Sequence, residues 1–510
     1  RLYKYPLQET KLREGKRPTI KDELGFSTIS IEQLDVENRE VLLKIGAAKA
    51  NLLTEQVNLL PEKPISSSVI SLALDDVIND QLTYKLYKAV DDLLSLNSPR
   101  LLGGKRLEAI PTLDSVQLLK TAVSLMDETT LAVQGPPGTG KTYVSAHAII
   151  ELVRSGKRIG IASNSHEAIR NLMIGCVDAM QPEDTNITLA HKVGQSADGY
   201  PSSMKRILRP TSNDDANLNN ANIVGGTAFF FARAEQIDKF DYLFIDEAGQ
   251  VSLPNVLAMG RSTKNIVLVG DPQQLPNVIQ GSHPYPAGLS SLEWLLGDHL
   301  TVPKDRGIFL PSTRRMHPKI CDFISEQVYD GRLISDPSTH HEAIISQTFP
   351  PNGAYWLDLE HDGNSQSSLE EAEAISKIYR ELVGSNYSSR MAKSVPLSNR
   401  DIIIVAPYNA QVNLLKSILP VGARIGTVDK FQGQEAAVSI ISMTASSTEN
   451  IPRGMNFLFS LNRINVAVSR AKALSLVLGS SKLRNARCDN IEQMKMVNTL
   501  CVLEKIPLKY

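Results

Sequence analysis

A phosphate-binding loop is predicted at 135–142, where the sequence reads Gly135-Pro136-Pro137-Gly138-Thr139-Gly140-Lys141-Thr142. An apolar run at 131–133 precedes this stretch, and a helical pattern at 143–150 follows it. Glycines let consecutive backbone N–H groups approach phosphate oxygens, and the N-terminus of the following helix adds partial positive charge. Lys141 is then expected to reach the β- and γ-phosphates, and the Thr142 hydroxyl to ligate Mg²⁺. The alternative is an ordinary glycine-rich turn between a strand and a helix.

Two acidic residues, Asp246 and Glu247, end an apolar strand at 242–245. A nucleotide hydrolase needs such a pair, because one carboxylate holds Mg²⁺ and the other orients and deprotonates the attacking water. We assign the first role to Asp246 and the second to Glu247. Acids at strand ends are also common as solvated caps, and the phosphate-binding loop earlier in the chain favours the catalytic interpretation.

A third strand, 266–269, leads into a polar turn that contains Asp271, Pro272 and Gln274. The Gln274 amide can hydrogen-bond a γ-phosphate while its loop faces another ligand, so this residue is expected to report the state of the nucleotide. The alternative is a simple Asp-Pro turn.

The composition predicts a globular protein with several hydrophobic cores. The chain has 510 residues, of which 42% are hydrophobic and 21% charged, and this length predicts about three to four domains. A net charge of −1 gives no general basic surface, so contacts with nucleic acid must come from a local channel. The four cysteines are scattered without metal-ligand spacing. No apolar run approaches the roughly 20 residues that cross a bilayer, so we expect a cytoplasmic, intracellular protein without a membrane partner.

Short strands alternate with helices from about residue 108 to the end of the chain. The strand patterns lie at 131–133, 158–162, 223–226, 242–245, 266–269, 354–357, 402–405, 438–441 and 474–478. Largely unbroken apolar strands are buried on both faces, as in a parallel sheet covered by helices. The pattern predicts an α/β fold with two parallel-sheet domains, 108–300 and 301–510, the first carrying a loop or small insertion at about 181–222.

The first part of the chain has a different pattern. Strand-like runs at 27–31 and 41–45 flank a polar turn, which predicts a small β-rich domain over 1–72. Apolar residues at roughly helical spacing over 74–96 then predict one long amphipathic helix. We place this stalk helix and its linker at 73–107.

Several motifs occur in the order seen in superfamily 1B helicases. They are Asp246-Glu247-Ala248-x-Gln250, Gly270-Asp271-Pro272-x-Gln274-Leu275-Pro276, Arg315-Met316-His317-Pro318, Asp429-x-Phe431-Gln432-Gly433-Gln434-Glu435 and Arg463-Ile464-Asn465-Val466-Ala467-Val468-Ser469-Arg470-Ala471-Lys472. The chain resembles the Upf-like group of that superfamily, which includes senataxin and the replication-associated nuclease-helicases. The resemblance covers about 108–480 and implies two RecA-like motor domains. Residues 1–107 resemble that group's β-barrel and stalk in layout only.

The resemblance implies further contacts to ATP. Gln117 matches the glutamine that reads adenine, and Glu435 resembles a ribose contact. Arg315 and Arg470 correspond to two arginines that reach the γ-phosphate from the second domain, where a permanent positive charge stabilises the transferred phosphoryl group. Because these arginines and Lys141 lie on different domains, nucleotide binding would close the cleft between the domains and hydrolysis would release it.

Two positions depart from the pattern of the group. Thr313 and Arg314 replace the usual Gln-Tyr, whose tyrosine stacks on adenine. A planar guanidinium can also lie on a purine, so Arg314 is expected to contact the base. The alternative is that Arg314 turns toward phosphate or solvent and Gln117 alone recognises adenine. The surroundings Cys321-Asp322-Phe323 and Gly281-Ser282-His283-Pro284 resemble bacterial helicases fused behind a RecB-like nuclease, so a nuclease domain is expected upstream of residue 1.

The resemblance also implies residues that hold the backbone of a nucleic acid. They are Ser163, Asn164 and Thr227 in the first domain, Thr427 and Val428 in the second, with Gln432, Gly433 and the motif at 407–411. It implies a monomeric helicase that uses ATP and Mg²⁺ and moves 5′→3′ along a single strand, with DNA favoured over RNA. The alternative is an ATP-gated clamp that remodels nucleic-acid–protein complexes without processive unwinding.

Overall fold

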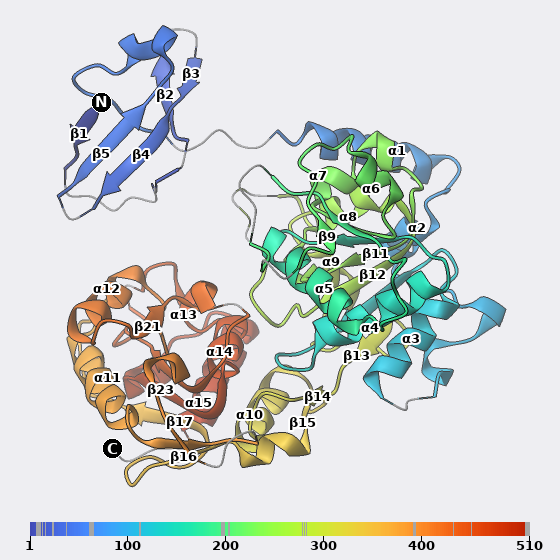
Figure 1. Cartoon of the computed structure of the whole chain (residues 1–510). Helices are drawn as coiled ribbons and strands as arrows, with labels where there is room; N and C mark the ends of the chain where they lie inside the picture. Colours follow the sequence, from blue (N-terminus) through green and yellow to red (C-terminus); the bar gives the residue numbers. More distant parts are fainter. Residues whose placement is uncertain are drawn as a thin grey trace. The chain divides into compact units, whose positions relative to one another are not determined.

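The computed structural model describes residues 1–6, 12, 14–15, 17–22, 25–36, 38–60, 66–111, 114–194, 199–201, 204–277, 279, 281, 283–390, 394–431, 433–449 and 451–504. Two compact units make up the chain, 1–68 and 69–510 (Figure 1). Gln432 and Ser282, which belong to motifs quoted above, lie outside the described residues, as do 505–510. None of the helices within these ranges combines the length and the apolar character that crossing a membrane requires.

The first unit is a small β-rich domain, as the sequence predicts. Strands β1 (Leu2–Lys4), β5 (Glu40–Lys44) and β4 (Ser30–Asp35) form an antiparallel sheet in that order, and β2 (Thr19–Asp22) and β3 (Gly25–Thr28) form a separate antiparallel pair. Its core consists of buried β-branched and leucine side chains, namely Ile20, Ile29, Ile31, Val41 and Leu43. The unit ends at Ser68, where the first α-helix begins.

Two helices, rather than the single long one predicted, cover the next stretch. They are α1 (Ser68–Leu82) and α2 (Lys88–Ser95). The buried carboxylate of Asp80 accepts hydrogen bonds from the backbone N–H groups of Leu86 (2.9 Å) and Tyr87 (3.1 Å). These bonds stabilise a turn between the helices, because the side chain replaces the carbonyl acceptors that a continuous helix would supply. The apolar spacing continues across this turn and conceals it in the sequence.

An eight-stranded parallel sheet forms the first motor domain. Its order is β13-β6-β12-β11-β7-β10-β8-β9. The strands are β6 (Thr130–Gln134), β7 (Ile159–Ala162), β8 (Leu189–His191), β9 (Ile207–Leu208), β10 (Ile223–Gly226), β11 (Phe240–Ile245), β12 (Thr263–Gly270) and β13 (Gly307–Phe309). All five strands predicted in this half of the chain form, and β6, β7 and β10 are buried along their whole length.

Alternate side chains of these strands enter two separate cores. On one face, Leu131 and Val133 pack with α3 (Ser115–Leu125), α4 (Lys141–Arg154) and α5 (His166–Ala179). On the other face, Ala132 packs in a core that includes α1, α2, α7 (Ala228–Phe231), α8 (Leu253–Gly260) and α9 (Ser291–Leu296). Successive residues of a strand point to opposite faces, so a short apolar run serves both cores.

The region at 181–222 is more ordered than the predicted loop or insertion. It contributes β8, β9 and α6 (Ala216–Asn220), and both strands extend the sheet beyond β10. The strands are only three and two residues long, and the Asn, Asp, Ser and Pro residues around them conceal them in the sequence. At the other edge, β13 pairs with β6, so the first sheet includes residues beyond 300.

A five-stranded parallel sheet forms the second motor domain, in the order β17-β23-β22-β20-β21. Its strands are β17 (Gly353–Asp358), β20 (Ile402–Val405), β21 (Arg424–Gly426), β22 (Ala436–Ser442) and β23 (Ala471–Gly479). One core contains α11 (Leu369–Leu382) and α12 (Asn409–Ile418), and the opposite core contains α10 (Pro318–Val328), α14 (Leu461–Val468) and α15 (Ile491–Glu504). Two parallel sheets with helices on both faces confirm the predicted α/β class.

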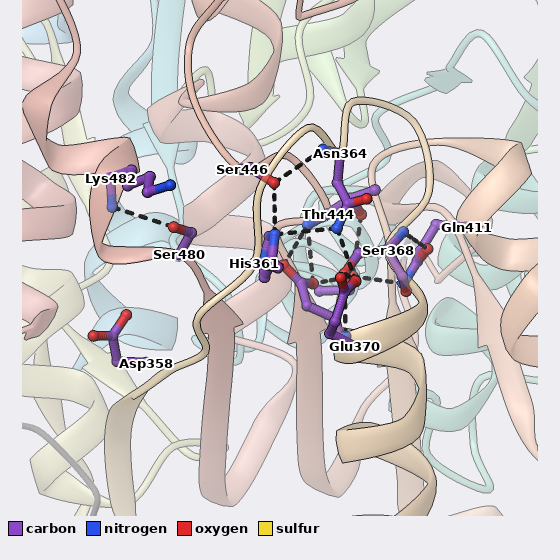
Figure 2. Close-up of polar contacts among 12 residues, drawn as sticks. Asp358, His361, Asn364, Ser368, Glu370, Gln411, Thr444, Ser446, Ser480 and Lys482 are labelled. Carbon is purple, nitrogen blue, oxygen red and sulfur yellow. Dashed lines mark hydrogen bonds and ion pairs between the residues drawn. The ribbon is translucent and has the colours of Figure 1, made fainter.

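A buried polar network fixes the chain directly after β22 (Figure 2). Glu371, in the first turn of α11, is fully buried, and each of its carboxylate oxygens lies 2.9 Å from the N–H nitrogen of Thr444. The Ser442 hydroxyl donates to the same carboxylate (2.5 Å), and His361 Nε2 lies 3.1 Å from it. His361 Nδ1 in turn lies 2.7 Å from the Ser446 hydroxyl. Thr444 has φ +70°, so the network holds a strained backbone in place.

We expect Glu371→Ala to lower the free energy of unfolding by about 3 kcal/mol, because it leaves buried N–H and O–H groups without their acceptor. Urea denaturation measures this loss. Glu373→Ala, at an exposed position of the same helix, is the control and should change stability by less than about 0.5 kcal/mol. Equal effects of the two substitutions would contradict the structural role given to Glu371.

Candidate active site

The residues predicted to bind and hydrolyse a nucleotide follow three neighbouring strands. The phosphate-binding loop follows β6, Asp271 follows β12, and Asp246 follows β11. The last residues of β6 and β12, Gln134 and Gly270, are paired in register. Because parallel strands end at a common edge, their loops lie side by side, which is where open α/β sheets bind ligands.

The phosphate-binding loop has the closed shape of a cradle. Gly138 and Gly140 both have φ +78°, a conformation that glycine adopts without strain. The Lys141 ammonium group folds over the loop and donates to the Gly135 carbonyl (2.6 Å). A Cβ atom added at Gly135 would lie 2.3 Å from Lys141 Cγ, so the backbone approaches the lysine too closely for any other residue. These features fit a group of phosphate size and charge.

Threonine hydroxyls stabilise the two proline carbonyls of the loop. Thr139 donates to the Pro136 carbonyl (2.9 Å), and Thr313, which comes from beyond the first sheet, donates to the Pro137 carbonyl (2.8 Å). Thr142 lies next to Lys141 in the first turn of α4 and is partly exposed. The loop is therefore formed in advance, with the Thr142 side chain accessible to a ligand.

Asp246 is a buried acid with an altered pKa. Burial, together with the negative charge of Glu247, raises the pKa of Asp246 to about 7, while the charge of Lys141 lowers it. Glu247 itself has φ +53° and is partly exposed, and strained backbone of this kind is typical of functional residues. A buried carboxyl group beside a second carboxylate fits a Mg²⁺ ligand, so Asp246 and Thr142 would hold that ion. Among the described residues no three His, Cys, Asp or Glu side chains gather as a metal cluster, and Mg²⁺ in phosphate sites needs only one or two protein carboxylates.

Arg470 of the second motor domain is buried without full hydrogen bonding. Its side chain donates through Nη1 to the Gln434 carbonyl (3.0 Å), whereas Nε and Nη2 have no partner among the described residues. The pKa of Arg470 is lowered to about 9, mainly by burial and also by the charge of Arg315. The charges of Glu247 and Glu435 act in the opposite direction and raise this pKa. Glu247 belongs to the first domain, so this guanidinium lies within electrostatic reach of the predicted catalytic base. An unpaired buried cation fits an anionic ligand.

Arg315 also reaches the phosphate-binding loop but is paired. A Cβ atom added at Gly138 would lie 2.5 Å from the Cβ atom of Arg315, so Arg315 packs directly against the loop. Its Nε lies 2.9 Å from a Glu435 carboxylate oxygen, and Lys472 Nζ lies 2.7 Å from the other oxygen. Glu435, the predicted ribose contact, is therefore engaged by two cations. Arg315 also donates from Nη1 to the Ser469 carbonyl (3.3 Å).

The two residues predicted to contact adenine are both exposed. The Arg314 N–H donates to the Gly138 carbonyl (2.9 Å), while its side chain is 73% exposed with Nε 3.5 Å from an Asp336 oxygen. Gln117 lies in the first turn of α3, where its N–H donates to the capping carboxylate of Asp114 (2.9 Å). Both side chains are accessible to a base.

Comparisons with known proteins agree with the motif order. Two family models, each described as an AAA domain, match residues 202–282 and 290–482. The DNA replication ATP-dependent helicase/nuclease DNA2 of Saccharomyces cerevisiae is 28% identical over 386 residues, which cover 68% of this chain and 24% of the relative. Putative helicase mov-10-B.1 of Danio rerio is 27% identical over 402 residues, covering 68% of this chain and 39% of the relative.

A third relative, the DNA polymerase alpha-associated DNA helicase A of Schizosaccharomyces pombe, is 26% identical over 419 residues, covering 68% of this chain and 60% of the relative. The chain belongs to the Upf-like helicases of superfamily 1. It spans less than two thirds of the length of each of these three relatives. Among solved structures, that of arterivirus nonstructural protein 10 (helicase) with DNA aligns with 96% of this chain and 78% of its own, at 12% identity and a TM-score of 0.43.

The residues that are predicted to hold nucleic acid lie at the carboxyl edges of both sheets. Ser163 and Asn164 follow β7, Thr227 follows β10, and Thr427 follows β21. Asn164 is exposed and donates a side-chain hydrogen bond to the Gln250 carbonyl, in the segment after Glu247. This bond joins the segment after β7 to the segment after Glu247.

Two of the predicted strand contacts are buried. Ser163 is 4% exposed and Val428 is 6% exposed. In the motif at 407–411, Gln411 is fully buried and donates to the Ser368 carbonyl (3.1 Å) at the start of α11. The Gln411 side chain therefore stabilises the start of α11 and is not accessible to a strand. Gly433, another predicted contact, is exposed.

Nothing in the sequence pattern singles out Tyr329, which joins the two motor domains. Its hydroxyl is buried directly after α10, donates to Asp271 (2.7 Å) and accepts from Asn465 of α14 (2.8 Å). Asp271 also accepts from the Gln274 amide (2.8 Å), and Asn465 donates to the Gln273 carbonyl (2.8 Å). The loop that carries Gln274 is therefore held from both domains, and Tyr329 acts as a positioning residue.

We expect Tyr329→Phe to reduce the stimulation of ATP hydrolysis by nucleic acid, because the bond network that links Gln274 to α14 loses its central hydroxyl. ATP affinity should change by less than about threefold, since Tyr329 does not touch the cradle, and stability should fall by about 2 kcal/mol. Tyr379→Phe is the control, because the Tyr379 hydroxyl is buried and has no hydrogen-bond partner in the described part of the chain. A Tyr329→Phe protein with wild-type stimulation would show that the contact does not position Gln274.

The role of Arg314 can be tested by ATP titration. If its guanidinium stacks on adenine, Arg314→Tyr should keep ATP affinity within a few-fold, and Arg314→Ala should lose a contact of about 0.5–2 kcal/mol. Arg380→Ala, at an exposed position of α11, controls for loss of charge. Wild-type ATP binding by Arg314→Ala would contradict stacking and leave base recognition to Gln117.

Proposed function

We propose that this chain hydrolyses ATP between its two RecA-like motor domains and uses the energy to move along a single-stranded nucleic acid and separate duplexes. Arg470 carries this proposal. Its buried guanidinium has two nitrogens without a partner among the described residues and lies within electrostatic reach of Glu247 on the other domain. A phosphoryl group would supply the missing acceptors. A cation contributed by a second domain ties hydrolysis to the closure of a cleft.

Each residue of the site would have a distinct task. Bound ATP, with Mg²⁺, supplies the γ-phosphoryl group that water attacks. Glu247 would accept the proton of that water, and Asp246 with Thr142 would hold the ion. Lys141 would exchange the Gly135 carbonyl for phosphate oxygens.

The arginines of the second domain would complete the site. Arg470 would donate to phosphoryl oxygens from Nε and Nη2, and Arg315 would join it after leaving Glu435. Opening the cleft withdraws both arginines, so hydrolysis and domain movement are coupled. Gln274 would transmit the nucleotide state through Asp271 and Tyr329 to α14.

We further propose that this monomeric, cytoplasmic motor moves 5′→3′, prefers DNA to RNA, and follows a nuclease domain upstream of residue 1. The resemblance of the sequence around 281–284 and 321–323 to nuclease-helicases supports the preference for DNA and the upstream nuclease domain. The relatives include both DNA and RNA helicases. ATPase stimulation by single-stranded DNA and RNA of equal sequence ranks the two substrates. A strand-displacement assay beside it separates a helicase from a clamp, which would hydrolyse ATP and displace no strand.

We expect Arg470→Ala to keep its affinity for a single strand while the ATPase rate falls by about 10³-fold or more, because the arginine acts on charge in the transition state. Glu247→Gln should bind nucleotide without turnover, and Lys141→Ala should lose nucleotide affinity. Arg487→Ala, at an exposed position of the second domain, is the control. A parallel loss of strand affinity and ATPase in Arg470→Ala would assign this arginine to nucleic-acid binding instead.

A further inference from the structure

The chain passes from the first sheet to the second motor domain through a connecting segment at 307–317 (Figure 1). The segment begins with β13, which pairs with β6 in the first sheet, and continues through β14 (Ser312–Thr313) to α10. Directly after β13, the Leu310 N–H donates to the Gln134 carbonyl (2.9 Å) at the end of β6. The connecting segment therefore runs beside the phosphate-binding loop, which follows Gln134.

Two consecutive carbonyls of the phosphate-binding loop accept hydrogen bonds from the connecting segment. The Thr313 hydroxyl donates to the Pro137 carbonyl (2.8 Å), and the Arg314 N–H donates to the Gly138 carbonyl (2.9 Å). A Cβ atom added at Gly138 would lie 2.5 Å from Thr313 Oγ1, so the loop has no room for a side chain there. The loop and the connecting segment are therefore in direct contact.

The Thr313 hydroxyl makes a second hydrogen bond, to the backbone of Arg315. A hydroxyl group donates one hydrogen bond and can accept others. Thr313 Oγ1 accepts from the Arg315 N–H (3.3 Å), and the threonine is fully buried. One hydroxyl thus joins a carbonyl of the loop to the main chain of an arginine that is predicted to reach the γ-phosphate. Thr313 is one of the two positions at which the chain departs from the pattern of the group, so this contact is not part of that pattern.

The backbone partners of the connecting segment change from the first domain to the second at Arg315. The Arg315 N–H is held through Thr313 to the phosphate-binding loop, whereas the His317 N–H donates to the Lys472 carbonyl (2.8 Å) in β23. The Arg315 side chain also extends to the second domain, where its Nε lies 2.9 Å from a Glu435 oxygen. A movement of one domain against the other therefore acts on the backbone near Arg315, which the Thr313 hydroxyl keeps at the loop.

We infer that Thr313 is a positioning residue for ATP hydrolysis, whose hydroxyl fixes the backbone of Arg315 to the phosphate-binding loop and so orients the Arg315 guanidinium toward the γ-phosphate. The inference rests on the proposed function and deepens it at the same site. Thr313 is fully buried, so it acts through Arg315 and not on the substrate. The effect is geometric, because a charge that stabilises a transferred phosphoryl group must be held at a defined position.

Steady-state ATPase kinetics in the presence of single-stranded oligothymidylate test this inference. Thr313→Val removes the hydroxyl at nearly constant volume and should lower kcat by about 10–100-fold, because the backbone of Arg315 loses its anchor. The KM for ATP should change by less than about threefold, since Lys141 and the N–H groups of the loop remain. Thr313→Ser retains the hydroxyl and should keep kcat within about threefold of the wild-type value.

Thr263→Val is the matched control. Thr263 is a buried threonine whose hydroxyl also donates to a backbone carbonyl, that of Asn265 (3.0 Å), and it begins β12 at the end away from the nucleotide site. Both variants should lower the midpoint of urea denaturation, but only Thr313→Val should lower kcat. An equal loss of kcat in the two variants would indicate a general effect of lost stability and overturn the inference.

Combination with Arg315→Ala shows whether Thr313 acts through Arg315. In that background Thr313→Val should change the residual rate by less than about twofold, because residues that act as a unit are not additive; single-turnover hydrolysis of radiolabelled ATP resolves this rate. A further loss as large as in the single variant would overturn the inference.

The remaining outcomes separate the inference from the proposed function. A raised KM at unchanged kcat in Thr313→Val would show that Thr313 shapes only the phosphate-binding loop, which overturns the inference and leaves the proposed function intact. Wild-type protein that hydrolyses no ATP would refute the proposed function itself. If Thr313→Val does not fold, Thr313→Ala, which adds no bulk, takes its place.

Discussion

Both motor domains depend on one constraint, which is that all strands of each sheet run in the same direction. Parallel strands end at a common edge, so loops from distant parts of the chain meet there. In the first sheet this edge presents the phosphate-binding loop, Asp271 and Asp246 on neighbouring strands, and then the segments that begin at Ser163 and Thr227. The predicted nucleotide site and the predicted strand contacts therefore occupy adjacent parts of one edge.

Two buried ionisable groups near the predicted nucleotide site, Asp246 and Arg470, are only partly compensated by their surroundings. Asp246 is buried beside Glu247 with a raised pKa, and Arg470 is buried with two nitrogens that make no hydrogen bond to a described residue. Burying charged groups in this way costs stability unless a ligand compensates them. Nucleotide with its metal ion has complementary charges for both groups. These two groups would thus favour closure of the cleft on ATP.

The hydrogen bonds around the cleft provide the physical connection between the sites. Asn164, at the strand-binding part of the edge, bonds the carbonyl of Gln250 just beyond Glu247. Tyr329 bonds Asp271 on one side and Asn465 of α14 on the other. Side chains that have discrete partners can change between arrangements when the domains move, and such two-state contacts are a physical basis for coupling. Glu371 has a comparable role within the second domain, where it fixes the backbone after β22.

The sequence alone determined the local chemistry and the class of fold. Apolar runs predicted the strands, because a strand buried on both faces has no polar alternation, and the phosphate-binding loop was recognisable because its glycines and lysine are contiguous. The turn between α1 and α2 was not predictable, because the Asp80 carboxylate that stabilises it leaves no trace in the apolar spacing. The strands β8 and β9 were not predictable, because two or three residues are too few to show a periodicity. Only the tertiary structure showed that two nitrogens of the Arg470 guanidinium have no partner among the described residues, that Arg315 pairs with Glu435, and that Tyr329 bonds residues of both motor domains. These properties depend on burial and on contacts between residues far apart in the chain, which spacing along a sequence does not encode.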